Sequence, residues 1–437
     1  MKRIITDKLV NWKTNSMRKP LLIRGARQVG KTYSVMEFAK SHFSGNVHCL
    51  NFEKNPELHS IFDRNLDSRR ILAELELVLN KRILPGNDLL FFDEIQECPK
   101  AIMALRYFYE ENPELHLIAA GSLLEFALKD ISFPVGRLQM LFMHPMTFEE
   151  FLLANGKELM AEKIMQAENQ LSDAIIAMVN DEMYKYFVVG GMPECVAAFV
   201  NTGSFIEAIN IQTDLIASLR QDFSKYAGHS DKRCLNSVLS SVARKTGEQI
   251  KYAGLDDSYT NPTIKKAFEL LETARLFTKV VAASPSGVPL GSSISEKKFK
   301  TVFLDIGLLS NLCGYYSDKM IQKQNLNAAY NGKLAEQFAG QELRAVSENL
   351  FYWSREARGS SAETDYLIEK EGEIIPIEVK SGKSGSLKSL HLLLHTFSNI
   401  KRAFVFTEDK YGELPEQKIK FLPLFNVGSF SNPNHWS

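Results

Sequence analysis

The chain has 437 residues, of which 45% are hydrophobic and 24% are charged. At about 100 to 200 residues per domain, this length predicts two to four folding units. The near-average composition excludes a disordered chain, a collagen-like fibre and a small disulfide scaffold. The 52 basic and 52 acidic residues give a formal net charge of zero, which argues against a protein that coats nucleic acid or membrane through bulk charge.

The five cysteines are an odd number and form no C-x-x-C pair, which argues against a disulfide framework and a zinc site. The first twenty residues lack the apolar core of a signal peptide, and no apolar run approaches the roughly 18 residues that a membrane span requires. We therefore expect a cytoplasmic protein with no membrane partner.

The order of apolar patterns along the chain predicts an α/β protein with four parts. Short apolar runs alternate with amphipathic stretches over residues 21–128, as in a parallel sheet, and helical spacing then dominates up to about residue 247. The four predicted parts are a P-loop NTPase parallel-sheet domain at 1–146, a helical lid or linker at 147–231, a winged-helix-like domain at 232–325 and an endonuclease-like α/β domain at 326–437.

A nucleotide-binding motif follows the first apolar strand. It has the pattern G-x-x-x-x-G-K-[ST] and comprises Gly25, Ala26, Arg27, Gln28, Val29, Gly30, Lys31 and Thr32. In this motif the backbone N–H groups and the helix N-terminus bind phosphate oxygens. We expect Lys31 to contact the β- and γ-phosphates of ATP and the Thr32 hydroxyl to bind Mg²⁺.

A second motif, LLFFDE, is an apolar strand that ends in Asp93 and Glu94. A buried parallel strand tolerates acids at its carboxyl end, where open α/β sheets bind ligands. We expect Asp93 to hold Mg²⁺ through water and Glu94 to polarise the attacking water, so the pair predicts ATP hydrolysis.

Two further candidates lie after the next predicted strand. Ser122 is placed to reach between the catalytic water and the γ-phosphate. Arg137 is a candidate for sensing the γ-phosphate, in the same subunit or in a neighbouring one of a homo-oligomer. The alternative for Arg137 is an ordinary surface arginine.

These segments resemble a prokaryotic family of AAA-type P-loop ATPases. The resemblance rests on the phosphate loop, LLFFDEIQ, IAAGSLLEF and PVGRLQMLFMHPMTFEEF, and continues through GGMPECV, FLDIGLL and IEVKSG. It implies an ATPase whose C-terminal domain of unknown function contains a winged helix and a restriction-endonuclease-like fold.

The C-terminal part has the predicted order α-β-β-β-α-β, with Glu336 in its first helix, Asp365 in a strand and Glu378-x-Lys380 in the next strand. This order is similar to the PD-(D/E)xK nuclease core. Glu336, Asp365 and Glu378 are candidate Mg²⁺ ligands, and Lys380 is a candidate for activating water. The alternative is an endonuclease-like fold that binds without cutting.

The winged-helix-like part carries candidate contacts to DNA phosphates, namely Lys265, Lys266 and Arg275, with Lys279 in the predicted ribbon. The alternatives are an ordinary solvated helix face and packing between domains. Three functions follow from these motifs. The first is a Mg²⁺-dependent ATPase that acts as a switch or motor, with DNA as a candidate partner. The others are an ATP-regulated DNA nuclease and a nucleotide-gated signalling protein with an inactive nuclease-like fold.

Overall fold

The computed structural model describes residues 1–128, 136–166, 170–223, 231–315, 328–347, 349–357, 360–381, 386–408 and 411–431. The chain divides into two compact units. The first comprises Met1–His144 with Thr273–Arg275, and the second comprises Pro145–Glu272 with Leu276–Ser437. The finer boundaries at 231 and 325 stay predictions, and residue 325 lies outside the described residues.

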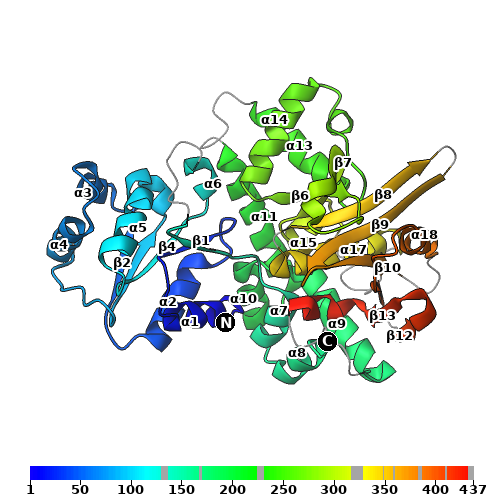
Figure 1. The fold of residues 1–437 in the computed structure, drawn as a ribbon, viewed down its shortest axis with the longest axis horizontal. Coiled ribbons are helices and arrows are strands. Elements are labelled where there is room, and N and C mark those ends of the chain that lie inside the picture. The colour runs from blue at the N-terminus through cyan, green and yellow to red at the C-terminus, as the bar shows by residue number, and fades with distance from the viewer. Residues whose placement is uncertain are drawn as a thin grey trace. The chain divides into compact units, whose positions relative to one another are not determined.

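The first unit is built on a parallel sheet with helices on both faces (Figure 1). Its elements are α1 (Ile5–Thr14), β1 (Leu21–Arg24), α2 (Lys31–His42), β2 (Val47–Asn51), α3 (His59–Asp63), α4 (Ser68–Leu79), β3 (Leu89–Asp93), α5 (Pro99–Glu111), β4 (His116–Ala120), α6 (Leu124–Ala127) and β5 (Gln139–Phe142).

The five strands lie in the order β2-β3-β4-β1-β5 and all pair in parallel. The inner strands β3 and β4 are buried on both faces, because helices cover each side of the sheet. Leu22, Leu90 and Phe92 pack in one core with residues of α4 and α5, while Ile23 and Phe91 on the alternate face are also fully buried. The parallel register brings the carboxyl ends of β1, β3 and β4 to one edge of the sheet.

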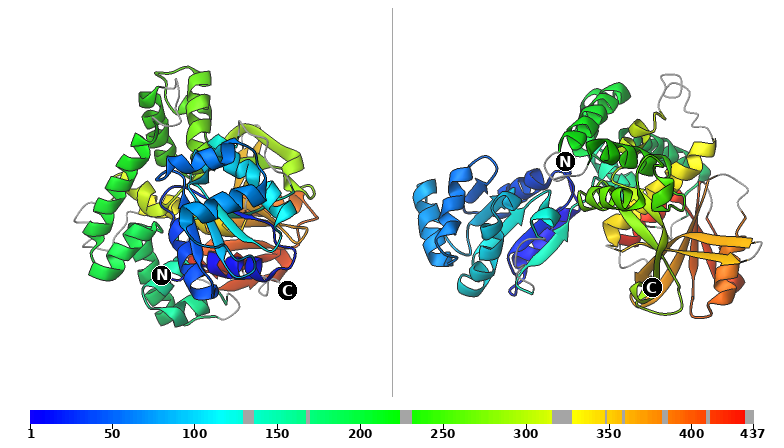
Figure 2. Two further views of the ribbon diagram at one scale, coloured as in Figure 1. Left: turned by 90° about the vertical axis from the view of Figure 1, so that its left-hand side faces the viewer. Right: turned by 90° about the horizontal axis from the view of Figure 1, so that it is seen from above.

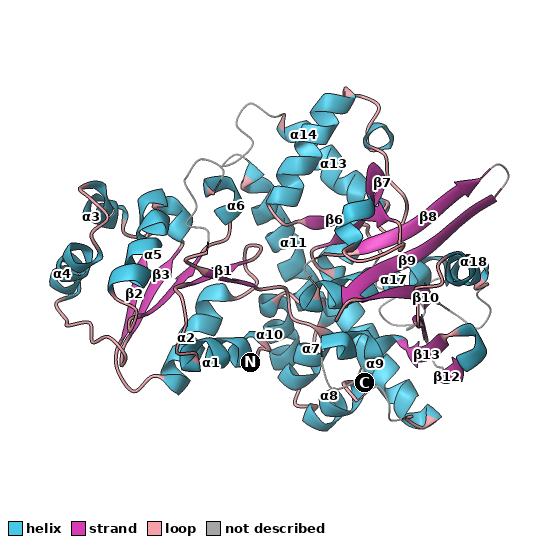
Figure 3. Ribbon diagram, viewed as in Figure 1, coloured by secondary structure: helices cyan, strands magenta, loops and turns pink. Residues whose placement is uncertain are grey.

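The second unit contains a helical part and a mixed sheet (Figure 3). Its helices are α7 (Phe148–Ala154), α8 (Glu158–Ile164), α9 (Asp173–Val189), α10 (Pro193–Thr202), α11 (Phe205–Gln221), α13 (Lys232–Arg244), α14 (Asn261–Thr273), α15 (Ile306–Leu312), α17 (Ala328–Val346) and α18 (Lys388–Thr396). Its strands are β6 (Phe277–Ala283), β7 (Ile294–Phe303), β8 (Phe351–Ala357), β9 (Ser360–Lys370), β10 (Glu373–Lys380), β11 (Ala403–Thr407), β12 (Gly412–Leu414) and β13 (Ile419–Pro423).

The mixed sheet joins two of the predicted parts. Its order is β12-β13-β11-β10-β9-β8-β6-β7, so the strands of the winged-helix-like part extend the sheet of the C-terminal part. β6 pairs with β8 at Val281 and Ala282, and β6 and β7 form an antiparallel ribbon. The two predicted parts therefore share one sheet.

The helices α9, α10 and α11 pack against one another and appear as a green group in both views of Figure 2. The first helix of this region, α7, begins with a capping box in which Thr147 and Glu150 satisfy each other's backbone N–H groups. Among the described residues, no helix has the length and apolar character needed to cross a bilayer.

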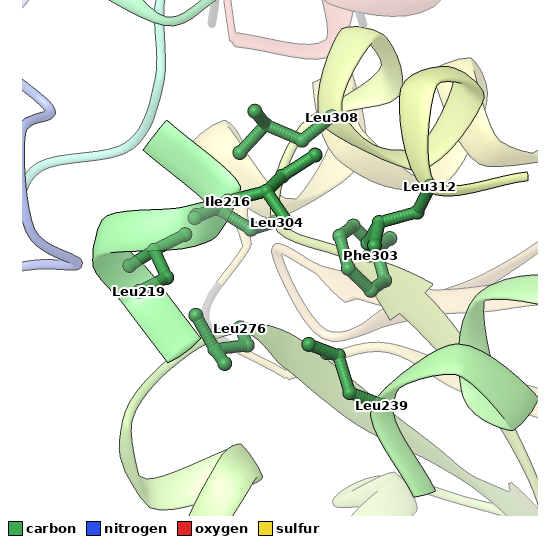
Figure 4. A pocket seen from close by; sticks show the side chains of 8 residues that line it. All are labelled: Ile216, Leu219, Leu239, Leu276, Phe303, Leu304, Leu308 and Leu312. Carbon is green, nitrogen blue, oxygen red and sulfur yellow. The ribbon is translucent and has the colours of Figure 1, made fainter. Parts of the chain in front are cut away.

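An apolar pocket in the second unit is lined by side chains from α11, α13, α15 and the β6–β7 region (Figure 4). Its lining residues are Ile216, Leu219, Leu239, Leu276, Phe303, Leu304, Leu308 and Leu312. The cavity measures only about 10 Å³, which is at the lower limit for one water molecule. We therefore regard it as a packing defect of the core.

A buried polar group ties the start of the second unit to its long helix α17. The Tyr186 hydroxyl donates to the Met146 carbonyl oxygen at 2.6 Å and accepts from Gln341 Nε2 at 2.8 Å. The Phe148 N–H donates to Glu342 Oε1 at 3.0 Å. Burial raises the pKa of Glu342 to about 8, so this carboxyl group is held in its protonated form at neutral pH.

Two glycine-containing segments meet at buried Asp305, which caps α15. Asp305 accepts from the Gly191 N–H at 2.6 Å and the Leu308 N–H at 3.0 Å. Gly190 has φ 73°, and a Cβ there would lie 2.3 Å from Asp305 Oδ1. Only glycine fits both constraints, which explains the GG and DIG segments noted in the sequence.

Replacing Glu342 with Gln should change how stability depends on pH. The folded pKa of about 8 lies above the unfolded value of about 4.3. The native state therefore retains a proton that the unfolded chain releases, and stability falls as pH rises between these values. We expect Glu342→Gln to raise the free energy of unfolding at pH 8, by an amount on the order of 4 to 5 kcal/mol, and to change it little at pH 4.

The measurement is urea unfolding across this pH range. The matched control is Glu158→Gln on the exposed surface of α8, which should leave the pH dependence unchanged. If the free energy of unfolding changed with pH in the same way for Glu342→Gln and the parent protein, the raised pKa of Glu342 would be contradicted.

Candidate functional site

The phosphate loop, residues 25–32, joins the end of β1 to the first turn of α2. Gly25 lies so close to a neighbouring segment that a Cβ there would be 2.2 Å from the Met143 carbonyl oxygen. Gly30 precedes α2 with φ 91°, and Gln28 also has a positive φ, of 63°. Because glycine alone adopts such a conformation without steric cost, both glycines of the motif are required by the shape of the loop.

Lys31 is the first residue of α2 and is only 7% exposed. Its Nζ donates to the carbonyl oxygens of Gly25, at 3.0 Å, and Ala26, at 2.8 Å. Burial lowers the pKa of Lys31 to about 8, although the Glu94 and Asp93 carboxylates act to raise it. The ammonium group would therefore gain stabilisation from an anionic phosphate in this loop.

Thr32 and Asp93 lie together at the carboxyl end of β3. The Thr32 hydroxyl donates to Asp93 Oδ1 at 2.9 Å, and Asn51 Nδ2 donates to Asp93 Oδ2 at 3.0 Å. Burial raises the pKa of Asp93, a cost that a cation at this carboxylate would relieve. A hydroxyl and a carboxylate are hard oxygen ligands that suit Mg²⁺, which usually retains waters and substrate oxygens as its other ligands.

Glu94 is held in position by two neighbouring polar side chains. Gln96 Nε2 donates to Glu94 Oε2 at 2.6 Å, and the buried Ser122 Oγ donates to the same oxygen at 3.4 Å. Glu94 has φ 49°, a left-handed conformation that costs a residue with a Cβ roughly 1 to 2 kcal/mol. Such strain is typical of functional positions. A Cβ on Gly121 would lie 2.3 Å from Gln96 Oε1, so this glycine leaves room for Gln96.

Arg137 lies at the opposite edge of the same sheet. Its Nε pairs with Glu110 near the end of α5 at 2.9 Å. Gln139, two residues further along the chain, is in register with Leu21 at the start of β1. The phosphate loop follows the other end of β1. Within one copy, the structure does not bring Arg137 to the nucleotide site, and a role for it in a neighbouring copy stays a prediction.

Three supporting residues were not predicted from the sequence. Asn51 and Gln96 contact the two acids, and Arg3 donates from its guanidinium to the carbonyl oxygens of Val29 at 2.9 Å and His144 at 2.8 Å. Asn51 ends a strand of the same sheet, which is a usable sequence signal. Arg3 gave none, because its partners are 26 and 141 residues away.

The predicted C-terminal acids gather around a lysine that the sequence analysis did not include. Lys300 of β7 is 2% exposed, and its Nζ lies 2.8 Å from Glu336, 2.5 Å from Glu363 and 3.5 Å from Asp365. Burial opposes the charge on Lys300, but the three carboxylates outweigh it and raise its pKa well above the usual value. Burial also raises the pKa of Glu336, to about 8.

The remaining predicted pair adjoins this group. Lys380 Nζ donates to Glu378 Oε1 at 2.6 Å, and the Val379 N–H donates to Asp365 Oδ2 at 2.7 Å. Burial and the nearby Asp365 raise the pKa of Glu378 to about 7. Within the described ranges, no group of three or more His, Cys, Asp or Glu side chains is arranged to hold a metal ion.

The lysines of the winged-helix-like part differ in their surroundings. Lys279 is 12% exposed, and its Nζ lies 5.0 Å from the centre of the Phe299 ring. Lys265 and Lys266 on α14 are both exposed, with Lys265 3.7 Å from Glu269. These two side chains therefore remain candidates for phosphate contacts, whereas Lys279 packs within its own part.

Three family models match the chain in succession. Residues 17–152 match an AAA domain family, residues 180–319 match a domain of unknown function (DUF8612), and residues 331–426 match another (DUF4143). The first match, together with the phosphate-loop geometry, supports an AAA-type P-loop ATPase for the first unit. The other two descriptions name neither a winged helix nor an endonuclease fold, so both assignments stay predictions. No curated protein matches the chain.

Solved structures show distant similarity. They include the Walker-type ATPase Paby2304 of Pyrococcus abyssi (15% identity, 70% of this chain and 94% of that chain, TM-score 0.45). A second example is RuvB of Thermotoga maritima, with 16% identity over 67% of this chain and 91% of that chain and a TM-score of 0.31. A third is ORC1 of Aeropyrum pernix in complex with DNA, with 10% identity over 74% of this chain and 95% of that chain and a TM-score of 0.27. Because these TM-scores are below 0.5, no functional conclusion rests on them.

Replacing Lys31 with Ala should abolish ATP binding. The substitution removes the ammonium group that the carbonyl oxygens of Gly25 and Ala26 hold in the loop. The backbone N–H groups of the loop alone cannot neutralise the phosphates. We expect at least a hundredfold loss of affinity for ATP by isothermal titration. Lys40→Ala, at the exposed end of α2, is the matched control, and equal affinities in the two variants would refute the assignment.

Proposed function

We propose that this protein is a Mg²⁺-dependent ATPase whose first unit hydrolyses ATP and acts as a nucleotide-driven switch on DNA. The observation that carries the hydrolysis is the position of Glu94 beside Asp93, Thr32 and Lys31 at one edge of the sheet. A protein that only bound nucleotide would not need a strained acid at that edge.

In this proposal each residue has a distinct role. Lys31 and the backbone of the phosphate loop bind the phosphates of ATP, and Thr32 with Asp93 would hold Mg²⁺. When bound, Mg²⁺ neutralises charge that develops on the phosphate oxygens. Glu94 accepts a hydrogen bond from the attacking water and aligns it with the γ-phosphorus.

The hydrogen bonds from Gln96 and Ser122 would fix the direction of the Glu94 carboxylate. Both donors point to Glu94 Oε2, which leaves Oε1 as the oxygen for water. Ser122 follows β4, the strand that lies between β1 and β3, so it is also close to where the γ-phosphate would lie.

Glu94→Gln should bind ATP but hydrolyse it slowly. The amide keeps the size of the side chain and loses the negative charge that polarises water, while Lys31, Thr32 and Asp93 are unchanged. We expect kcat to fall by about a hundredfold or more and the Kd for ATP to change less than threefold. Phosphate release and nucleotide titration measure the two effects.

Glu97→Gln is the matched control, because Glu97 is exposed and lies three residues further in the same short helical turn. It should hydrolyse ATP at the parental rate. If Glu94→Gln also hydrolysed ATP at the parental rate, a residue other than Glu94 would be the catalytic acid.

The DNA part of the proposal rests on the exposed Lys265 and Lys266 of α14. Their ammonium groups would displace counterions from DNA phosphates, so binding should weaken as salt rises. We expect duplex DNA to raise the ATPase rate of the parent protein and to have little effect on Lys265→Glu/Lys266→Glu.

The control for this charge reversal is Lys8→Glu/Lys81→Glu, two exposed lysines of the first unit. It should respond to DNA as the parent does. Equal stimulation of all three proteins would exclude α14 as the DNA contact, and the absence of any stimulation would favour a protein partner.

A further inference from the structure

The second unit contains a compact group of charged side chains that the ATPase proposal does not use. Four are acidic and two are basic: Glu336 of α17, Glu363 and Asp365 of β9, Glu378 and Lys380 of β10, and Lys300 of β7. Counted formally, the acids of this group outnumber its lysines by two.

Lys300 occupies the centre of this acidic cluster. Its Nζ lies within 3.5 Å of oxygens from Glu336, Glu363 and Asp365, and the side chain is almost entirely removed from water. The face of the Tyr352 ring lies 5.7 Å from Nζ on another side. The ammonium group therefore occupies the position between these three carboxylates.

The oxygens that a metal ion would need are already engaged. Asp365 Oδ1 faces Lys300 and Oδ2 accepts from the Val379 N–H, while Glu336 Oε1 accepts from Lys300. The buried Glu378 Oε2 has no hydrogen-bond partner. A buried carboxylate oxygen without a partner can accept a further ligand, so Glu378 fits the role of a metal ligand once Lys300 is removed.

Lys300 reaches the cluster from a different part of the sequence. It belongs to the β6–β7 ribbon, whereas the acids belong to α17, β9 and β10. Gln249, which also precedes the C-terminal part, donates to Glu363. The ribbon thus supplies the cation for a site whose acids resemble those of a metal-dependent nuclease.

We propose that Lys300 takes the place of a divalent cation in this cluster and keeps the nuclease-like part of the chain closed to metal. The cluster is then a latent metal site, whose ligands are Glu336, Asp365 and Glu378, and the full-length protein neither binds Mn²⁺ there nor cuts DNA. This inference is independent of ATP hydrolysis by the first unit.

The test replaces Lys300 by an uncharged side chain of similar length. Because Lys300→Met alone would leave four acids with one lysine, the second substitution Glu363→Gln restores the original net charge and retains the three candidate ligands. We expect Lys300→Met/Glu363→Gln to bind one more Mn²⁺ per chain than the parent in the absence of nucleotide. Electron paramagnetic resonance counts the bound ions, and Mn²⁺ should also raise the Tm of this variant by several degrees more than that of the parent.

Lys380→Met/Glu363→Gln is the matched control, since it removes the other lysine of the cluster and leaves Lys300 in its central position. It should bind the same number of Mn²⁺ ions as the parent. Adding Asp365→Asn to the Lys300 variant should remove the extra ion.

Three results would overturn the proposal. The first is that the parent protein binds an Mn²⁺ ion that Asp365→Asn removes. The second is that the parent nicks DNA in the presence of Mn²⁺ and that Asp365→Asn abolishes the nicking. The third is no additional Mn²⁺ in a folded Lys300→Met/Glu363→Gln variant. If that variant does not fold, Lys300→Gln with the same second substitution keeps the comparison valid, because Gln retains a donor for Glu336.

Discussion

Burying an ammonium group is the constraint on which both charged sites of this protein depend. Lys31 is held by two neutral carbonyl oxygens, and burial lowers its pKa to about 8. Lys300 is held by three carboxylates, which raise its pKa well above the usual value. The first lysine is incompletely compensated and is therefore ready for an anionic ligand, whereas the second already has its counterions. The same residue type is thus incompletely compensated in one unit and fully compensated in the other.

Close backbone contact is the second constraint, and it accounts for the glycines of several motifs. Gly25 lies against the Met143 carbonyl oxygen, and Gly190 lies against the Asp305 carboxylate. At Gly25 a methyl group would overlap a backbone atom, and at Gly190 it would overlap a carboxylate oxygen at a position that also has a positive φ. These glycine motifs, which mark a nucleotide site or a family in the sequence, are therefore also required for packing. In the phosphate loop, the close contact at Gly25 lies beside the buried ammonium group of Lys31.

The mixed sheet of the second unit brings a lysine from one segment next to acids from another. β6 and β7 extend the sheet that carries the C-terminal acids, and β7 contributes Lys300. A segment that begins near residue 330 lacks this lysine, so its chemistry differs from that of the whole chain. An endonuclease-like order of acids is consequently not sufficient evidence for cutting, because a lysine from a neighbouring segment contacts three of these carboxylates.

Local pattern was enough to determine the parallel α/β unit, the phosphate loop and the acids at the end of β3. In these cases the residues that act together are adjacent in sequence, or lie at strand ends that a parallel sheet must bring to one edge. The predicted strands that carry Asp365 and Glu378-x-Lys380 also agree with β9 and β10. By contrast, β5, β12 and β13 were not predicted, because their sequences QMLF, GEL and IKFLP carry little periodic signal.

Only the tertiary structure decided which charges face one another. It placed Arg137 with Glu110 at the far edge of the sheet and Arg3 beneath the phosphate loop. It also placed Lys300 among the acids of α17 and β9. Lys300 is separated from Asp365 by 65 residues, and neither spacing nor composition relates them. Their pairing follows from the register of strands in one sheet and from the energetic need to neutralise buried carboxylates, which no local pattern in the sequence encodes.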